Sequence, residues 1–191
     1  MIKELLPAVF LDRDGVLCRS IVRDGKPYAT HNLRDFILMP NSKKSVFSLK
    51  QLGFKVIVVT NQPDIGNGFV TIETVESMHK ILREKVLVDD IFFCAHRQNE
   101  GCDCRKPKPG MLLDASEKHG IDLSKSFIIG DRASDIEAGK RAGCRTIFID
   151  RHYTEPHPLN PEVTFNSLQK AVEYIVSNKF TSLCETLVSL K

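Results

Sequence analysis

The sequence predicts an α/β fold in which helices cover both faces of one parallel sheet. Two observations support this prediction. Short apolar runs, rich in β-branched and aromatic residues, alternate along the chain with segments of helical spacing. Polar residues directly follow several of these runs, and parallel sheets bind ligands beyond the carboxyl ends of their strands. The same pattern therefore places a candidate functional site at that edge of the sheet.

Five apolar runs bounded by turn residues are expected to form buried strands. In chain order these are residues 8–11, 56–59, 91–93, 127–129 and 146–149. Four helices are expected between them, at 42–52, 71–87, 109–119 and 134–142. The first, third and fourth of these precede a glycine that would cap the last turn. Ser134 and Glu137 fit a capping box, which predicts Ser134 as the N-cap of the fourth helix.

The remaining segments are less regular. Residues 18–40 lack clear periodicity and predict a loop excursion beside the first strand, too short for a separate cap domain. Beyond the core, helices are expected at 168–176 and 183–190. We therefore predict one domain over residues 1–178 and a helical tail over 179–191. A monomer is expected, with a dimer through this tail as the alternative.

Composition restricts the class of protein. With 42% hydrophobic and 27% charged residues, the chain has the composition of a soluble globular protein. No apolar run approaches the roughly 20 residues needed to span a bilayer. The first seven residues lack the pattern of a secretory signal, so a cytoplasmic location is expected. The net charge of +3 comes from Lys and Arg spread along the chain, which argues against nucleic acid as a partner.

Two pairs of carboxylates follow predicted strands. Asp12 and Asp14 follow the first strand, and Asp131 and Asp135 follow the fourth. Neighbouring carboxylates repel one another unless a cation or a proton lies between them. Because hard oxygen ligands suit Mg²⁺, the sequence predicts a magnesium site at this edge of the sheet.

A hydroxyl and an ammonium group accompany these acids. Thr60 stands at the end of the second predicted strand, and Lys106 precedes the third predicted helix. Phosphoryl transfer needs in-line positioning and neutralisation of the phosphoryl oxygens more than covalent work from the protein. A carboxylate nucleophile, a metal ion, a hydroxyl and a lysine together meet that need.

The four segments, in this order over residues 9–136, resemble the four motifs of the haloacid dehalogenase (HAD) superfamily. The resemblance implies a Rossmann-like sheet and hydrolysis of phosphate monoesters. Asp12 would be the nucleophile, and Asp14 would protonate the leaving alcohol and later activate water. Thr60 and Lys106 would bind the phosphoryl oxygens, which completes the expected catalytic set.

The resemblance also implies a set of magnesium ligands. These are the side chain of Asp12, the main-chain carbonyl of Asp14 and the side chain of Asp131, with Asp135 in a supporting role. Asp135 has an alternative interpretation, because a negative charge near a helix N-terminus is favourable without any metal.

A second metal site is predicted by Cys94, His96, Cys102 and Cys104. Three thiols and one imidazole suit tetrahedral Zn²⁺. All four positions would be protein groups, so no coordination site remains for water and the ion would be structural. The alternative is a set of unmetallated thiols beside a surface histidine.

The string Cys-Asp-Cys-Arg-Lys-Pro at 102–107 is similar to the zinc-containing branch of the superfamily. That branch includes heptose bisphosphate phosphatases and histidinol-phosphate phosphatases, and its zinc loop takes the place of a cap domain. The resemblance implies a small phosphorylated sugar as substrate and removal of the 7-phosphate of D-glycero-D-manno-heptose 1,7-bisphosphate. Histidinol phosphate is the alternative substrate.

A bisphosphate needs a cation for the phosphate that is not transferred, and arginine suits bidentate phosphate binding. Arg132 directly follows a motif aspartate and could serve in this way, or could be a solvated residue at a helix start. The candidate substrate-binding residues are Arg13, Asn61, Gln62, Arg105 and Arg132. Alternatives in other functional classes are a non-catalytic, zinc-stabilised interaction protein and a polynucleotide 3′-phosphatase.

Overall fold

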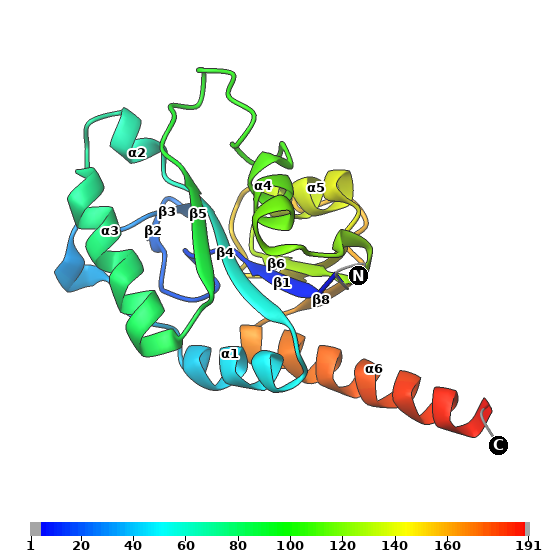
Figure 1. Cartoon of the computed structure of the whole chain (residues 1–191). Coiled ribbons are helices and arrows are strands. Elements are labelled where there is room, and N and C mark those ends of the chain that lie inside the picture. Colours follow the sequence, from blue (N-terminus) through cyan, green and yellow to red (C-terminus); the bar gives the residue numbers. More distant parts are fainter. Residues whose placement is uncertain (1–4, 190–191) are drawn as a thin grey trace.

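The computed structural model describes the backbone of residues 5–189 and the side chains of residues 5–179. Its centre is a six-stranded sheet with the order β5-β4-β1-β6-β7-β8 (Figure 1). The strands are β1 (Ala8–Leu11), β4 (Lys55–Asn61), β5 (Asp90–Cys94), β6 (Phe127–Gly130), β7 (Arg145–Ile149) and β8 (Val163–Phe165). All neighbouring strands are parallel, so the predicted fold class is confirmed.

β1 lies between β4 and β6, and all four of its residues are buried. Leu11 lies opposite Val58 of β4 and Ile129 of β6. Because the three strands are parallel and in register, the segments that follow Leu11, Asn61 and Gly130 come together at one edge of the sheet. This edge carries the motif residues.

Helices cover both faces of the sheet (Figure 1). They are α1 (Ser42–Gln51), α2 (Pro63–Gly66), α3 (Ile72–Ile81), α4 (Gly110–His119), α5 (Ala133–Ala142) and α6 (Leu168–Ser189), and a π-helical segment, Leu82–Val86, continues α3. On one face, Val9 and Leu11 share a core cluster with Val46 of α1, Met78 of α3 and Val172 of α6. This face is therefore covered by α1, α3 and α6.

The opposite face has its own cluster. Ala8 and Phe10 of β1 pack there with Met111 and Leu112 of α4 and Ala138 of α5. Successive residues of a strand point to opposite faces of the sheet, so β1 contributes alternately to the two clusters. This arrangement explains why its sequence is a continuous apolar run.

The excursion over residues 18–40 is more regular than predicted. It contains an antiparallel hairpin of β2 (Ile21–Arg23) and β3 (Lys26–Tyr28), followed by a short 3-10 helix, Leu33–Asp35. The turn residues Asp24 and Gly25 both have positive φ, as expected for an Asp-Gly hairpin turn. The three-residue strands are too short to show a periodic pattern, and for the same reason the sequence did not predict β8.

The structure departs from the prediction in α6 and at the start of α5. One helix, α6, replaces the two expected at 168–176 and 183–190, and it crosses the predicted boundary at 178/179. Between them, Ser177 and Asn178 donate side-chain hydrogen bonds to main-chain oxygens four residues earlier, and no glycine or proline stops the helix. α5 begins at Ala133, so Ser134 is not the N-cap. The extent of the domain and the role of the tail stay predictions.

No helix within residues 5–189 combines the length and the apolar character needed to cross a membrane.

Candidate active site

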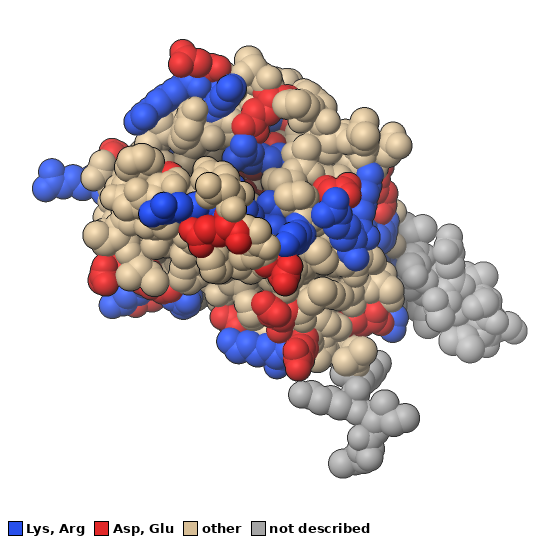
Figure 2. Space-filling view, turned by 90° about the horizontal axis from the view of Figure 1, so that it is seen from above, with Lys and Arg blue, Asp and Glu red and all other residues tan. Residues whose placement is uncertain are grey.

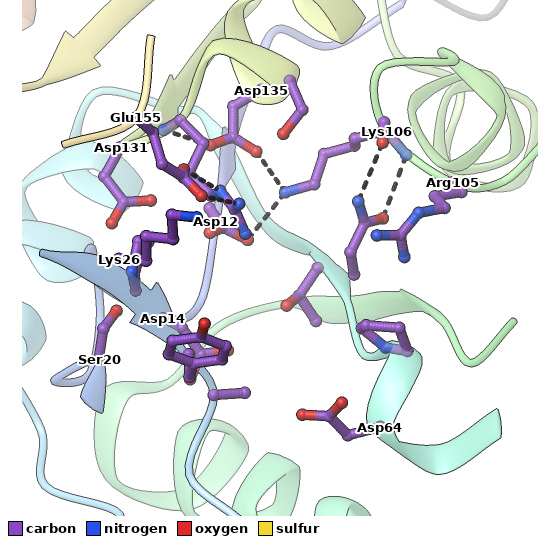
Figure 3. A pocket seen from close by; sticks show the side chains of 18 of the residues that line it. Asp12, Asp14, Ser20, Lys26, Asp64, Arg105, Lys106, Asp131, Asp135 and Glu155 are labelled. Atoms are coloured by element: carbon purple, nitrogen blue, oxygen red, sulfur yellow. Dashed lines mark hydrogen bonds and ion pairs between the residues drawn. The ribbon is translucent and has the colours of Figure 1, made fainter. Parts of the chain in front are cut away.

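A cavity of about 330 Å³ opens at the carboxyl ends of β1, β4 and β6. Figure 2 views this side of the molecule, where Lys and Arg side chains lie next to acidic ones around a hollow. Figure 3 shows Asp12, Asp135 and Lys106 pointing toward one another inside it. The structure thus brings together residues that are more than 90 positions apart in the sequence, as the parallel sheet predicts.

Lys106 is the central cation of the cavity. Its Nζ lies 2.8 Å from Asp12 Oδ1 and 2.6 Å from Asp135 Oδ1, and it donates a hydrogen bond to the main-chain oxygen of Val59. Burial alone would lower the pKa of Lys106, but the two carboxylates outweigh burial and raise it above its ordinary value. Lys106 is therefore a permanent positive charge beside Asp12.

Asp131 is buried at the end of β6. Burial raises the pKa of its carboxyl well above the ordinary value, and the charges of Asp12 and Asp135 raise it further. Its Oδ2 accepts a hydrogen bond of 2.9 Å from the Tyr153 hydroxyl, whereas its buried Oδ1 has no hydrogen-bond partner among the described residues. A buried carboxylate oxygen without a partner is costly, and a cation is the ligand that would satisfy it.

These residues fit a divalent cation. Carboxylate oxygens of Asp12, Asp131 and Asp135 lie within 4.8 Å of one another. The two oxygens of Asp135 are already engaged, one with Lys106 and the other with the main-chain N–H of Arg132 at 3.0 Å. Asp12 and Asp131 are therefore the side chains available to bind the ion directly, and Asp135 acts by holding Lys106 and the start of α5.

Gly15 packs against this group and provides a test of its geometry. Its φ is +80°, and a Cβ at this position would overlap Asp131 Oδ2. Replacing Gly15 with Ala is expected to lower the free energy of unfolding by about 3 kcal/mol and to weaken binding of the predicted Mg²⁺, because the added Cβ displaces Asp131. Gly53 is the matched control, because its φ is +82° but nothing lies within 4 Å of the added Cβ. Gly53→Ala should cost only about 1 kcal/mol. Equal costs in urea unfolding would contradict the placement of Asp131.

Asp14 lies beside this group, with 14% of its side chain exposed to the cavity. Arg13 and Gln62, which the sequence suggested as substrate-binding residues, are buried and do not line the cavity. Both side chains instead contact the Asp14 carboxylate from inside the protein, at 2.9 Å each. Arg13 and Gln62 therefore support Asp14 from behind and do not face the cavity.

The end of β4 contributes Thr60 and Asn61 to the cavity. The side-chain amide of Asn61 donates to the main-chain oxygen of Lys106 at 3.0 Å and accepts from its main-chain N–H at 3.1 Å. This pair of hydrogen bonds ties the segment that carries Lys106 to the end of β4. Asn61 therefore positions Lys106 as well as lining the cavity.

The outer wall of the cavity includes both predicted arginines, Arg105 and Arg132. Arg132 forms a bidentate pair with Glu155, at 2.9 and 2.5 Å. The structure also adds Lys26 from the β2–β3 hairpin and Asp64 from α2 (Figure 3). Neither Lys26 nor Glu155 belongs to a strand-end motif, so no signal in the sequence pointed to them.

The four predicted zinc ligands come together at the end of β5 and in the loop between β5 and α4, which rises above the carboxyl ends of the strands (Figure 1). Cys102 Sγ lies 3.6 Å from Sγ of both Cys94 and Cys104, and His96 Nδ1 lies 3.5 and 3.3 Å from those two sulfurs. Tetrahedral coordination with zinc–sulfur bonds of about 2.3 Å separates sulfurs by about 3.8 Å. The observed spacing fits a tetrahedral zinc ion.

Comparison with known proteins gives concordant results. The HAD-hydrolase-like family model matches residues 103–171. The D-glycero-beta-D-manno-heptose-1,7-bisphosphate 7-phosphatase of Pseudomonas aeruginosa is 39% identical over 146 residues, covering 74% of this chain and 79% of that protein. The D-glycero-alpha-D-manno-heptose-1,7-bisphosphate 7-phosphatase of Photorhabdus laumondii is 33% identical over 156 residues, covering 75% and 82%.

Solved structures agree with this result. The crystal structure of D,D-heptose 1.7-bisphosphate phosphatase from B. bronchiseptica, complexed with magnesium and phosphate, superposes with a TM-score of 0.79. The two proteins are 25% identical, and the match covers 91% of this chain and 99% of that one. The sequence identities, the shared fold and the grouping of Asp12, Lys106 and Asp131 lead to one conclusion. The chain belongs to the haloacid dehalogenase superfamily of phosphatases, in the family that includes the heptose-1,7-bisphosphate 7-phosphatases.

Proposed function

We propose that this protein is a Mg²⁺-dependent phosphatase that removes the 7-phosphate of D-glycero-D-manno-heptose 1,7-bisphosphate. The observation that carries the proposal is the charge on the outer wall of the cavity. Lys26 and Arg105 line this wall, and neither has a carboxylate partner among the described residues. Asp64 and Glu155, the acidic residues of the wall, are both paired. The unpaired cations suit a second phosphate on the substrate.

The reaction proceeds in two steps on Asp12. Its carboxylate attacks phosphorus, and the bond between phosphorus and the sugar oxygen breaks as Asp14 donates a proton to that oxygen. An aspartyl phosphate and the free sugar hydroxyl result. Asp14 then takes a proton from water, whose oxygen attacks phosphorus, releases inorganic phosphate and regenerates Asp12. The sum of the two steps is hydrolysis of one phosphate ester.

Three groups assist this chemistry. Lys106, at 2.8 Å from Asp12, places a positive charge beside the transferred phosphoryl group. Thr60 offers its hydroxyl to a phosphoryl oxygen. When bound by Asp12, Asp131 and the main-chain carbonyl of Asp14, Mg²⁺ supplies further positive charge against the phosphoryl oxygens.

The charge distribution disfavours the alternative substrate, histidinol phosphate. Its ammonium group would need a free carboxylate on the outer wall. Asp64 lies 2.8 Å from His31, and Glu155 is held by Arg132. Neither acid is available without breaking an existing pair.

Phosphate release in the presence of Mg²⁺ tests the proposal. The substrates are both anomers of heptose 1,7-bisphosphate, histidinol phosphate and a single-stranded DNA 3′-phosphate. We expect kcat/KM for one heptose anomer to exceed that for histidinol phosphate by about 100-fold or more. A reversed preference would contradict the proposed substrate. No release from any substrate would favour the non-catalytic interaction protein.

The proposed substrate site predicts that Arg132 contributes measurably to kcat/KM for the bisphosphate. Replacing Arg132 with Leu is expected to lower kcat/KM for the bisphosphate by about 10- to 100-fold, because it leaves the carboxylate of Glu155 unpaired on the cavity wall, where its negative charge repels the second phosphate. Arg141→Leu is the matched control, since Arg141 lies on the same helix, α5, but only pairs with Glu137 at the surface. Equal effects of the two changes would remove Arg132 from the substrate site.

A further inference from the structure

A buried hydrogen-bond network lies directly behind Asp14. Its main member is Arg13, whose side chain is 0% exposed. Arg13 Nε donates to Asp14 Oδ2 at 2.9 Å, and Nη2 donates to Asp14 Oδ1 at 3.2 Å. The same Nη2 donates to Gln62 Oε1 at 2.8 Å. A fully buried guanidinium is stable only when such partners surround it.

The orientation of the Gln62 amide follows from this network. Arginine can only donate hydrogen bonds, so the amide atom that faces Arg13 must be the oxygen. The amide nitrogen of Gln62 therefore faces the other way, where it donates to Asp14 Oδ2 and to Thr60 Oγ1, both at 2.9 Å. One amide thus connects the proposed general acid to the proposed phosphate-binding hydroxyl.

This orientation has a consequence for Thr60. A hydroxyl has one proton to donate and two lone pairs that accept. Because Thr60 Oγ1 accepts from Gln62, its own proton remains free to point into the cavity that Thr60 lines. The Gln62 amide therefore keeps the hydroxyl in the donor state that a negatively charged phosphoryl oxygen requires.

His79 completes the network on the far side of Arg13. Its ring is 0% exposed, and its Nε2 lies 3.4 Å from Arg13 Nη1. Burial and the charge of Arg13 lower the pKa of His79 to about 4, so the ring is neutral and Nε2 can accept from Arg13. The proton then sits on Nδ1, which lies 3.7 Å from Glu76 Oε1. The ring of Phe36 lies 5.7 Å from the Arg13 guanidinium carbon.

We propose that Arg13 and Gln62 are positioning residues of the reaction, and that His79 supports Arg13. Arg13 holds the Asp14 carboxylate with two hydrogen bonds in the orientation from which it serves the leaving group. Gln62 holds Asp14 and sets Thr60 as a donor to the phosphoryl group. This inference rests on the proposed function, because it assumes that Asp14 protonates the leaving oxygen.

Leaving-group dependence provides the test. Heptose 1,7-bisphosphate releases a sugar alcohol that must receive a proton, whereas p-nitrophenyl phosphate releases a nitrophenolate that departs without one. In Arg13→Lys the charge remains, but the bidentate contact to Asp14 is lost. We expect kcat/KM to fall by about 30- to 100-fold on the heptose substrate and by no more than about 3-fold on p-nitrophenyl phosphate. Similar losses on both substrates would overturn the positioning role of Arg13.

Gln62→Glu should give a different signature. A glutamate can still accept from Arg13, but it cannot donate to Thr60 or to Asp14. The Thr60 hydroxyl would turn to donate to it, and Asp14 would lose one hydrogen bond. We expect kcat/KM to fall by about 10-fold or more on both substrates, because the phosphoryl group loses a donor in either case. Gln51→Glu, on the exposed end of α1, is the matched control and should leave both values unchanged. An unchanged p-nitrophenyl phosphate activity in Gln62→Glu would overturn the role assigned to the amide.

His79 variants keep the inference testable if Arg13→Lys does not fold. His79→Leu removes the acceptor for Arg13 and should cause a smaller loss that is again confined to the heptose substrate. His79→Gln restores an acceptor and should recover most of that loss, whereas no recovery would contradict the supporting role of His79.

Asp14→Asn distinguishes failure of the proposed mechanism from failure of the positioning roles inferred here. If it shows no selective loss on the heptose substrate, the proposed mechanism fails; if it does and the Arg13 and His79 variants do not, only this inference fails.

Discussion

Replacing Asp12 with Asn is expected to lower kcat by about 10⁴-fold or more, because a carboxamide has no anionic oxygen to attack phosphorus. The fold should be retained. Lys106 keeps its contact with Asp135 at 2.6 Å, and the loss of one carboxylate relieves part of the repulsion on Asp131. The melting temperature should therefore stay within a few degrees of that of the unchanged protein.

Phosphate release and acid-quench trapping of the phosphoenzyme measure this effect. The unchanged protein should trap an acid-stable, hydroxylamine-sensitive phosphate on Asp12, and the variant should trap none. Asp114→Asn is the matched control, since Asp114 is exposed on α4, away from the cavity. More than about 1% of the original kcat in Asp12→Asn would exclude Asp12 as the nucleophile.

Loss of the proposed zinc ion is expected to have the largest effect on stability. Cys102→Ser removes one of the four ligands, and structural zinc contributes to folding free energy directly. We expect a loss of about 3 kcal/mol or more, which corresponds to a fall in melting temperature of roughly 6–12 °C for a chain of this size. Elemental analysis should find about one zinc per chain in the unchanged protein and much less in the variant.

A pair of histidine variants controls for nonspecific effects. His96→Asn removes a proposed ligand and should lower the melting temperature in the same way. His152→Asn alters a histidine that is 84% exposed and outside the cluster, and should have little effect. If zinc is absent from the purified protein and Cys102→Ser melts normally, the cluster is not a zinc site.

The loop that carries the Cys/His cluster is joined to the candidate active-site cavity by the chain itself. Cys104 ends the predicted ligand set two residues before Lys106, and Asn61 binds the main chain of Lys106 from the end of β4. Loss of zinc is therefore expected to disturb the position of Lys106. Weaker activity in Cys102→Ser at temperatures where it remains folded would agree with this connection.

Much of the reaction centre could be predicted from the sequence, for a simple physical reason. Asp12 and Asp131 directly follow β1 and β6, Thr60 lies at the end of β4, and parallel strands bring their carboxyl ends to one edge of the sheet. The grouping of Cys94 and Cys102 was predictable because residues so close in the sequence need no long-range packing to meet. Such local patterns can be recognised in the sequence without knowing how distant segments pack.

The role of Arg13 depends on the direction in which its side chain points. Asp12 and Asp14 both line the cavity, whereas Arg13 between them points into the protein. Alternation along the strand could have suggested this, yet the sequence alone favoured a substrate contact for Arg13. Only packing against Gln62 and His79 shows that its charge is satisfied inside the protein.

The amino-acid sequence by itself determined the α/β class of this protein, the acids at the strand ends and the Cys/His cluster, because each depends on local spacing and apolar periodicity. The tertiary structure alone decided which charges remain free on the cavity wall. Lys26 lies on the three-residue strand β3, and Glu155 lies in the loop after β7, where it pairs with Arg132. These contacts join segments more than 20 residues apart that carry no periodic signal, so only the packed chain could show them.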